Sequence, residues 1–62
     1  MKRFDTYFGS IDIYPRFGDN GDFCEAYVSE TEDFICEIHK PLDDITKEDV
    51  EDIAHSNAEM FM

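Results

Sequence analysis

The groups best able to do chemistry in this 62-residue chain are sixteen carboxylates, two cysteines and two histidines. In the stretch FGDNGDF, Asp19, Asn20 and Asp22 offer oxygen ligands for a cation. A calcium loop needs more oxygen ligands at set spacings, so we interpret this stretch first as a turn. Asp52 and His55 lie three residues apart, and two ligands without a third do not define a metal site. We therefore predict no metal site.

The same groups do not predict catalysis. Cys24 and Cys36 fall on the core-facing side of predicted strands and His39 on the other side, which separates a cysteine–histidine nucleophile pair. The three glycines are scattered and form no phosphate-binding loop. We predict a protein that is not an enzyme, with no catalytic residue and no cofactor, whose two thiols are buried and reduced.

The charge of the chain is its most unusual property. Sixteen Asp and Glu residues stand against five Lys and Arg, giving a net charge of -11. Self-repulsion of this size destabilises a small fold, and solubility alone needs less charge. The charge argues against direct binding to nucleic acid or anionic membranes, whose phosphates would repel it. It favours a basic protein partner.

Composition predicts one folded domain over residues 1–62. Hydrophobic residues make up 42% of the chain, which is too many for a disordered acidic tail. The N-terminal Met1-Lys2-Arg3 is followed by Phe4-Asp5 rather than by the apolar run of a signal peptide. No segment approaches the roughly 20 apolar residues of a membrane span. We expect a cytoplasmic location.

Residues 10–17 and 23–29 alternate between apolar and polar side chains, as in strands with one buried face. Asn20-Gly21 between them predicts a two-residue type I′ hairpin turn, whose central residues need positive φ. On the core-facing side this turn pairs Phe17 with Cys24, Pro15 with Ala26 and Ile13 with Val28. On the other side it pairs Arg16 with Glu25, Tyr14 with Tyr27 and Asp12 with Ser29. Both hydrophobic patterns agree with this register.

A turn at residues 30–33 leads to a third strand, FICEIH, at residues 34–39, which ends at Lys40-Pro41. A three-residue loop directs Phe34, Cys36 and Ile38 to the core-facing side and Ile35, Glu37 and His39 to the other. Residues 3–8 extend the first strand or form a short additional one, and Gly9 is a candidate β-bulge.

The last third of the chain predicts a helix. Thr46 and Asp49 have capping-box spacing, and Ile45 and Val50 have the spacing of a hydrophobic staple. The apolar stripe comprises Val50, Ile53, Ala54, Asn57, Ala58 and Phe61, and the opposite side carries Glu48, Asp52, His55 and Glu59. The predicted fold is α+β: a three-stranded antiparallel meander with one C-terminal amphipathic helix on one face.

One helix leaves the other face of the sheet uncovered. The side chains predicted there are Asp12, Tyr14, Arg16, Glu25, Tyr27, Ile35 and Glu37, with Phe8 nearby. Tyrosines flanked by carboxylates are typical of a binding interface, although cross-strand aromatic pairs also stabilise a sheet without any partner.

Carboxylates recur at the spacing of nucleic-acid phosphates. Same-face residues repeat about every 6.8 Å along a strand, and phosphates lie about 7 Å apart along a nucleic-acid strand. The candidate partner-binding residues are Asp12, Tyr14, Asp19, Asp22, Glu25, Tyr27, Glu30, Glu32, Asp33, Ile35 and Glu37. A second candidate acidic face comprises Glu48, Asp52 and Glu59.

In size and composition the whole chain resembles the small acidic anti-CRISPR and anti-restriction proteins of phages, several of which are DNA mimics. The resemblance implies an inhibitor that binds the basic nucleic-acid-binding surface of a CRISPR effector, restriction enzyme or repair enzyme in the host cytoplasm. The alternative is a non-enzymatic interaction module or homodimer that uses the uncovered sheet face or a sheet edge. A third reading is a metal-binding regulator built on His39, His55 and carboxylates.

Overall fold

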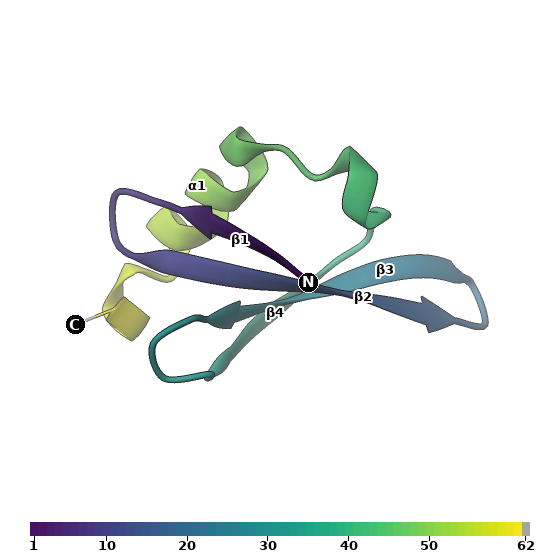
Figure 1. Cartoon of the computed structure of the whole chain (residues 1–62), viewed down its shortest axis with the longest axis horizontal. Coiled ribbons are helices and arrows are strands. Elements are labelled where there is room, and N and C mark those ends of the chain that lie inside the picture. Colours follow the sequence, from purple (N-terminus) through teal and green to yellow (C-terminus); the bar gives the residue numbers. More distant parts are fainter. Residues whose placement is uncertain (62) are drawn as a thin grey trace.

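A computed structural model describes residues 1–61 as a four-stranded antiparallel sheet with one α-helix. The strands lie in the order β1 (Lys2–Asp5), β2 (Ser10–Gly18), β3 (Gly21–Val28) and β4 (Phe34–Ile38). They are followed by a 3₁₀ turn η1 (Leu42–Asp44), the helix α1 (Lys47–Ser56) and a second 3₁₀ segment η2 (Ala58–Phe61). Figure 1 shows α1 and η1 on one side of the sheet. The predicted α+β class is confirmed, and the number of strands is corrected from three to four.

The additional strand β1 pairs antiparallel with the start of β2. Thr6 and Gly9 close the turn between them, with each backbone N–H donating to the other's carbonyl at 2.9 and 3.2 Å. Gly9 has φ 148°, a conformation that side-chain-bearing residues rarely adopt. It is therefore a turn residue and not the predicted bulge.

The β2–β3 hairpin turns at Asp19 and Asn20, one residue earlier than predicted, and pairs Gly18 with Gly21. A type I′ turn at Asn20-Gly21 needs positive φ at both residues, and only Gly21 has it, at 113°. The register therefore moves by two residues, so that Phe17 faces Asp22, Tyr14 faces Glu25 and Asp12 faces Tyr27. Because the shift is even, the side chains keep their predicted faces. Phe17 is nevertheless 82% exposed, so the prediction that it packs in the core was wrong.

Strand β4 departs from its prediction at a bulge. Cys36 faces Ala26 and Ile38 faces Cys24 as expected, and the register then shifts so that Phe34 faces Tyr27. The extra residue opposite this step reverses the faces of the first two residues. Phe34 is 48% exposed on the uncovered side, and Ile35 packs against the core. Both predicted positions were wrong.

The start of α1 is confirmed in detail. Thr46 accepts a hydrogen bond from the Asp49 N–H, and the Asp49 carboxylate accepts one from the Thr46 N–H, at 3.2 and 3.1 Å. Ile45 and Val50, the predicted staple, are both buried. The helix is shorter than its apolar stripe, because Asn57 leaves helical geometry at φ -124° and the chain continues as η2.

The core lies between the sheet and α1. Its buried members are Ile11, Ile13, Cys24, Ala26, Ile45, Val50 and Ala54. Phe8 packs against this cluster and its ring lies 6.0 Å from that of His55, so it belongs to the helix side and not to the uncovered face. Within residues 1–61, no helix has both the length and the apolar content required to cross a membrane.

Candidate protein-interaction surfaces

Basic residues are paired with the carboxylates that the fold shields from water. Four ion pairs are present in the described chain: Arg3–Asp12 and Arg16–Glu25 at 2.7 Å, Lys40–Asp49 at 3.1 Å and Lys47–Glu51 at 3.7 Å. All four carboxylates are buried or half-buried. The remaining basic residue, Lys2, lies 5.1 Å from the centre of the Phe4 ring.

The other twelve carboxylates make no ion pair within residues 1–61, and every one of them is exposed. They are Asp5, Asp19, Asp22, Glu30, Glu32, Asp33, Glu37, Asp43, Asp44, Glu48, Asp52 and Glu59. The fold therefore neutralises the acids it shields and leaves the exposed ones facing water without a cation.

Six of these carboxylates follow the β3–β4 side of the sheet, and we call them the acidic edge. They are Asp19, Asp22, Glu30, Glu32, Asp33 and Glu37. Asp19, Asp22 and Glu37 line one hollow of about 320 Å³ with His39 beside the hairpin tip. The other three lie in the β3–β4 loop. This loop is about 20–25 Å from the hairpin tip, which is the length of β3 at about 3.3 Å per residue. The acidic edge thus spans several phosphate spacings.

Five further carboxylates lie on η1, α1 and η2, and we call them the helix-side carboxylates. They are Asp43, Asp44, Glu48, Asp52 and Glu59. This set contains all three residues of the predicted second acidic face, each of them exposed. Glu59 lies in η2 and so beyond the end of α1.

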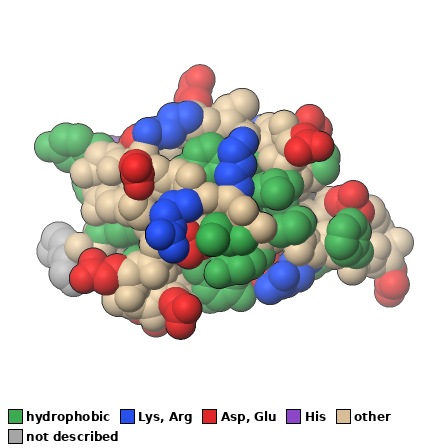
Figure 2. Space-filling model, viewed as in Figure 1, with side chains coloured by type: hydrophobic (Ala, Val, Ile, Leu, Met, Phe, Trp, Pro, Cys, Tyr) green, Lys and Arg blue, Asp and Glu red, His purple; other side chains and the backbone are tan. Residues whose placement is uncertain are grey.

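The uncovered side of the sheet carries three aromatic rings in a row. Tyr14 and Tyr27 have ring centres 5.4 Å apart, and Tyr27 and Phe34 have ring centres 5.5 Å apart, both edge-to-face. The Arg16 guanidinium lies 5.6 Å from the centre of the Tyr14 ring and also pairs with Glu25. Figure 2 shows hydrophobic and basic side chains in the middle of the view and carboxylates around its outline.

We call this surface the aromatic face. It comprises Arg3, Asp12, Tyr14, Arg16, Glu25, Tyr27 and Phe34. The sequence predicted five of these residues on this side and did not predict Arg3 or Phe34. Glu37 was also predicted on this side, and its pairing with Glu25 confirms that position. In the N-terminal strand Arg3 alternates with Phe4, and this alternation could have placed Arg3 on the uncovered side. The bulge that exposes Phe34 has no recognisable local sequence pattern.

Asp12 was predicted to contact a partner, and the fold encloses it instead. It is 5% exposed and accepts hydrogen bonds from Arg3 Nε and Ser29 Oγ, both at 2.7 Å. The Arg3 hydrogen bond is the main cause that holds the pKa of Asp12 below its ordinary value of 3.8, and burial opposes it. Asp12 therefore joins β1, β2 and the end of β3.

Replacing Asp12 with asparagine is expected to lower the free energy of unfolding by about 1–2 kcal/mol at pH 7, a modest cost because Arg3 is half exposed. A lowered pKa stabilises the fold above 3.8 and loses that contribution as the pH falls through the folded-state value. The difference between wild type and Asp12→Asn should therefore persist at pH 5–7 and shrink below pH 4, as urea titrations would measure. An equal difference at every pH would contradict the role of the ion pair.

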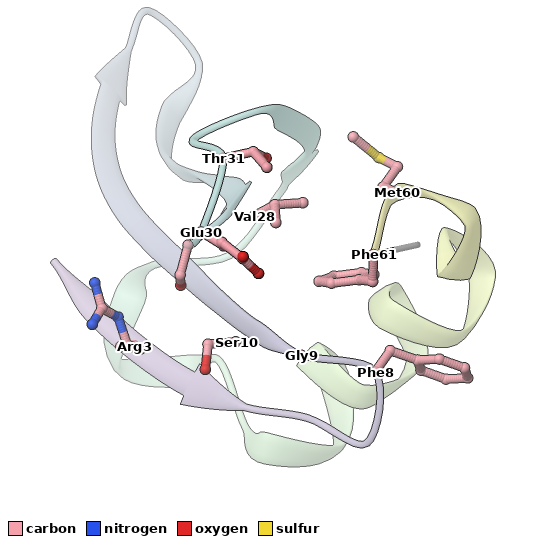
Figure 3. A pocket seen from close by; sticks show the side chains of 10 residues that line it. Arg3, Phe8, Gly9, Ser10, Val28, Glu30, Thr31, Met60 and Phe61 are labelled. Atoms are coloured by element: carbon pink, nitrogen blue, oxygen red, sulfur yellow. The ribbon is translucent and has the colours of Figure 1, made fainter.

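Other candidate chemistry does not assemble. Cys24 and Cys36 are free thiols whose pKa is raised by burial, which disfavours the nucleophilic thiolate. Within residues 1–61, no three histidine, cysteine or acidic side chains are placed to hold a metal ion. A hollow of about 500 Å³ lies between Ser10, Glu30 and η2. Figure 3 shows that the Phe61 ring points into it. Arg3 lines this hollow, and its guanidinium already donates a hydrogen bond to the Asp12 carboxylate.

Comparisons of the chain with family models, curated proteins and solved structures gave no match.

Proposed function

We propose that this protein is a non-enzymatic inhibitor that occupies the basic nucleic-acid-binding surface of a target protein and blocks access of DNA or RNA by charge mimicry. The observation that carries the proposal is the division of the carboxylates: four shielded ones are paired, and twelve exposed ones are not. A chain that needed acids only for solubility would do well with fewer of them.

The acidic edge is the part of this surface that fits a phosphate-binding groove best. Asp22 and Glu37 lie on adjacent strands and the other four carboxylates lie in the turns at the two ends of β3, so the sheet holds two groups of carboxylates several phosphate spacings of about 7 Å apart. Lys and Arg residues that normally bind phosphates would pair with Asp19, Asp22 and Glu37 at the hairpin tip and with the β3–β4 loop. The resemblance in size and composition to phage-encoded anti-CRISPR and anti-restriction proteins supports a phage-encoded inhibitor acting in the host cytoplasm.

The experiment that tests this proposal has two parts. The chain is immobilised and incubated with lysates of candidate hosts, including cells that express CRISPR effectors, and bound proteins are eluted with duplex DNA, with salt or with an uncharged polymer. Each purified nucleic-acid-binding protein that duplex DNA elutes is then mixed with labelled DNA and increasing amounts of the chain. Competitive displacement of the DNA, weakening with ionic strength, is the expected result. Partners that neither DNA nor salt elutes, or DNA binding that the chain leaves unchanged, would refute the mimic.

A further inference from the structure

We propose that the aromatic face is a self-complementary surface through which two copies of this chain form a dimer. The inference goes beyond charge mimicry and does not depend on the target of the acidic edge. It is drawn from the composition, the charge balance and the size of this face.

The composition of the face is that of an interface and differs from the rest of the surface. Aromatic residues and arginine are enriched where proteins meet, and lysine and acids are depleted. Both arginines of the chain lie here, beside a row of three rings, and all three lysines lie elsewhere. The ring contacts and ion pairs hold these side chains in place, so little conformational entropy remains to be lost on association.

Charge complementarity favours a second copy as the occupant. A two-fold interface brings the same patch together twice, so the patch must carry groups that complement one another. The side of the sheet that carries the aromatic face has two arginines, the two carboxylates that pair with them, and two exposed carboxylates without an ion pair within residues 1–61, Asp5 and Glu37. The helix side presents carboxylates without an arginine, so two copies meeting there would repel each other. The side chains of Arg3 and Arg16 remain 56% and 46% exposed.

Unpaired carboxylates at the border of the face supply the opposite partners. Glu32 shares a hollow with Tyr14, Arg16 and Tyr27, and Glu37 lies directly opposite Glu25 in the strand register. An arginine of one copy can therefore meet Glu32 or Glu37 of the other without breaking its own internal pair.

The size of the face sets the expected affinity. Four strands spaced by about 4.8 Å make a surface about 19 Å wide and, over six to eight residues, about 20–26 Å long. An area on the order of 450 Å² per copy is at the low end of specific interfaces. We therefore expect a dissociation constant in the micromolar range, about 1–100 µM, and not a permanent dimer.

The test is sedimentation equilibrium of the full chain from about 1 µM to about 1 mM at about 0.15 M salt, which screens the repulsion between two acidic chains. The variant Phe34→Glu buries an unpaired charge twice in each dimer and should weaken association by about 100-fold or more. Tyr7→Glu and Phe17→Glu add the same charge at aromatic residues that are 88% and 82% exposed outside the face, and both should dimerise within about threefold of wild type.

A second measurement uses the wild-type chain, so its result does not depend on whether Phe34→Glu folds correctly. In wild type, a dilution series followed by two-dimensional NMR should shift the backbone signals of residues 12–16 and 25–27 and leave those of α1 unchanged. A wild-type chain that remains a monomer throughout the concentration range overturns the proposal. Equal weakening by all three glutamate variants, or dilution shifts confined to another surface, would overturn it as well. Because no other molecule is present, these results are independent of whether the chain is a nucleic-acid mimic.

Discussion

Replacing Gly9 with alanine is expected to lower the free energy of unfolding by about 2–6 kcal/mol, a large part of the stability of a 62-residue fold. Two costs combine at this position. Its φ of 148° is strained for any residue with a side chain, at about 1–3 kcal/mol. A Cβ atom there would also lie 2.8 Å from Cδ1 of Phe61, and overpacking of this kind costs about 1–3 kcal/mol. Urea denaturation followed by circular dichroism would measure the loss.

Gly21 provides a matched control for the backbone strain. It also has positive φ, at 113°, but a Cβ atom added to it would meet no atom within 4 Å. Gly21→Ala should therefore cost only the strain, about 1–3 kcal/mol. Truncation of the ring in Gly9→Ala/Phe61→Ala should recover part of the clash, so that the double variant is more stable than the two single losses predict. Equal losses at Gly9 and Gly21 would show that Phe61 does not restrict this turn.

The parts of the fold that follow from local pattern were predictable. Alternation in residues 10–17 and 23–29 assigned side chains to the two faces of the hairpin correctly, even though the register was wrong by two residues, because an even shift preserves the faces. The capping box at Thr46 and Asp49 placed the helix start to the residue, since both hydrogen bonds are made within four positions of the chain.

The parts that depend on distant contacts were not predictable. Asn20-Gly21 is typical of a type I′ turn, which needs positive φ at both residues. In the structure the turn residues are Asp19 and Asn20, and of Asn20 and Gly21 only Gly21 has positive φ. The bulge opposite Tyr27 exchanges the faces of Phe34 and Ile35, and nothing in the sequence of residues 34–38 marks it. The pairing of Asp12 with Arg3 depends on β1, which the sequence left undecided between a separate strand and an extension.

The candidate partner-binding surface was likewise predictable only in part. Composition alone indicated that carboxylates greatly outnumber cations, and that imbalance is the basis of the proposed mimicry. The structure adds the information about which carboxylates remain available. Asp12 and Glu25 were predicted as partner contacts, and both are bound to arginines of the same chain. The carboxylates that the proposed mimicry assigns to a basic groove are the exposed ones without an ion pair at the hairpin tip, on β4 and in the β3–β4 loop.

Neutralising five carboxylates of the acidic edge is expected to weaken binding to the target by about 100- to 1,000-fold. The variant carries Asp19→Asn, Asp22→Asn, Asp33→Asn, Glu32→Gln and Glu37→Gln, and it retains Glu30, which lines the hollow beside Arg3. Each exposed charge that meets a basic side chain contributes about 0.6–0.8 kcal/mol, and five such contributions amount to about 3–4 kcal/mol. Displacement of labelled DNA from the target, measured at several salt concentrations, gives the affinity and its salt dependence.

The helix-side carboxylates allow a control with the same change in charge and composition. Asp43→Asn, Asp44→Asn, Asp52→Asn, Glu48→Gln and Glu59→Gln also replace three aspartates and two glutamates, all of them exposed. This variant should bind within about tenfold of wild type, because only long-range attraction is reduced. Both variants should be at least as stable as wild type, since each relieves self-repulsion. If the two variants lose affinity equally, net charge and not the acidic edge determines binding. If only the helix-side variant loses affinity, the mimic presents α1 to its target, and the acidic edge would be the wrong surface.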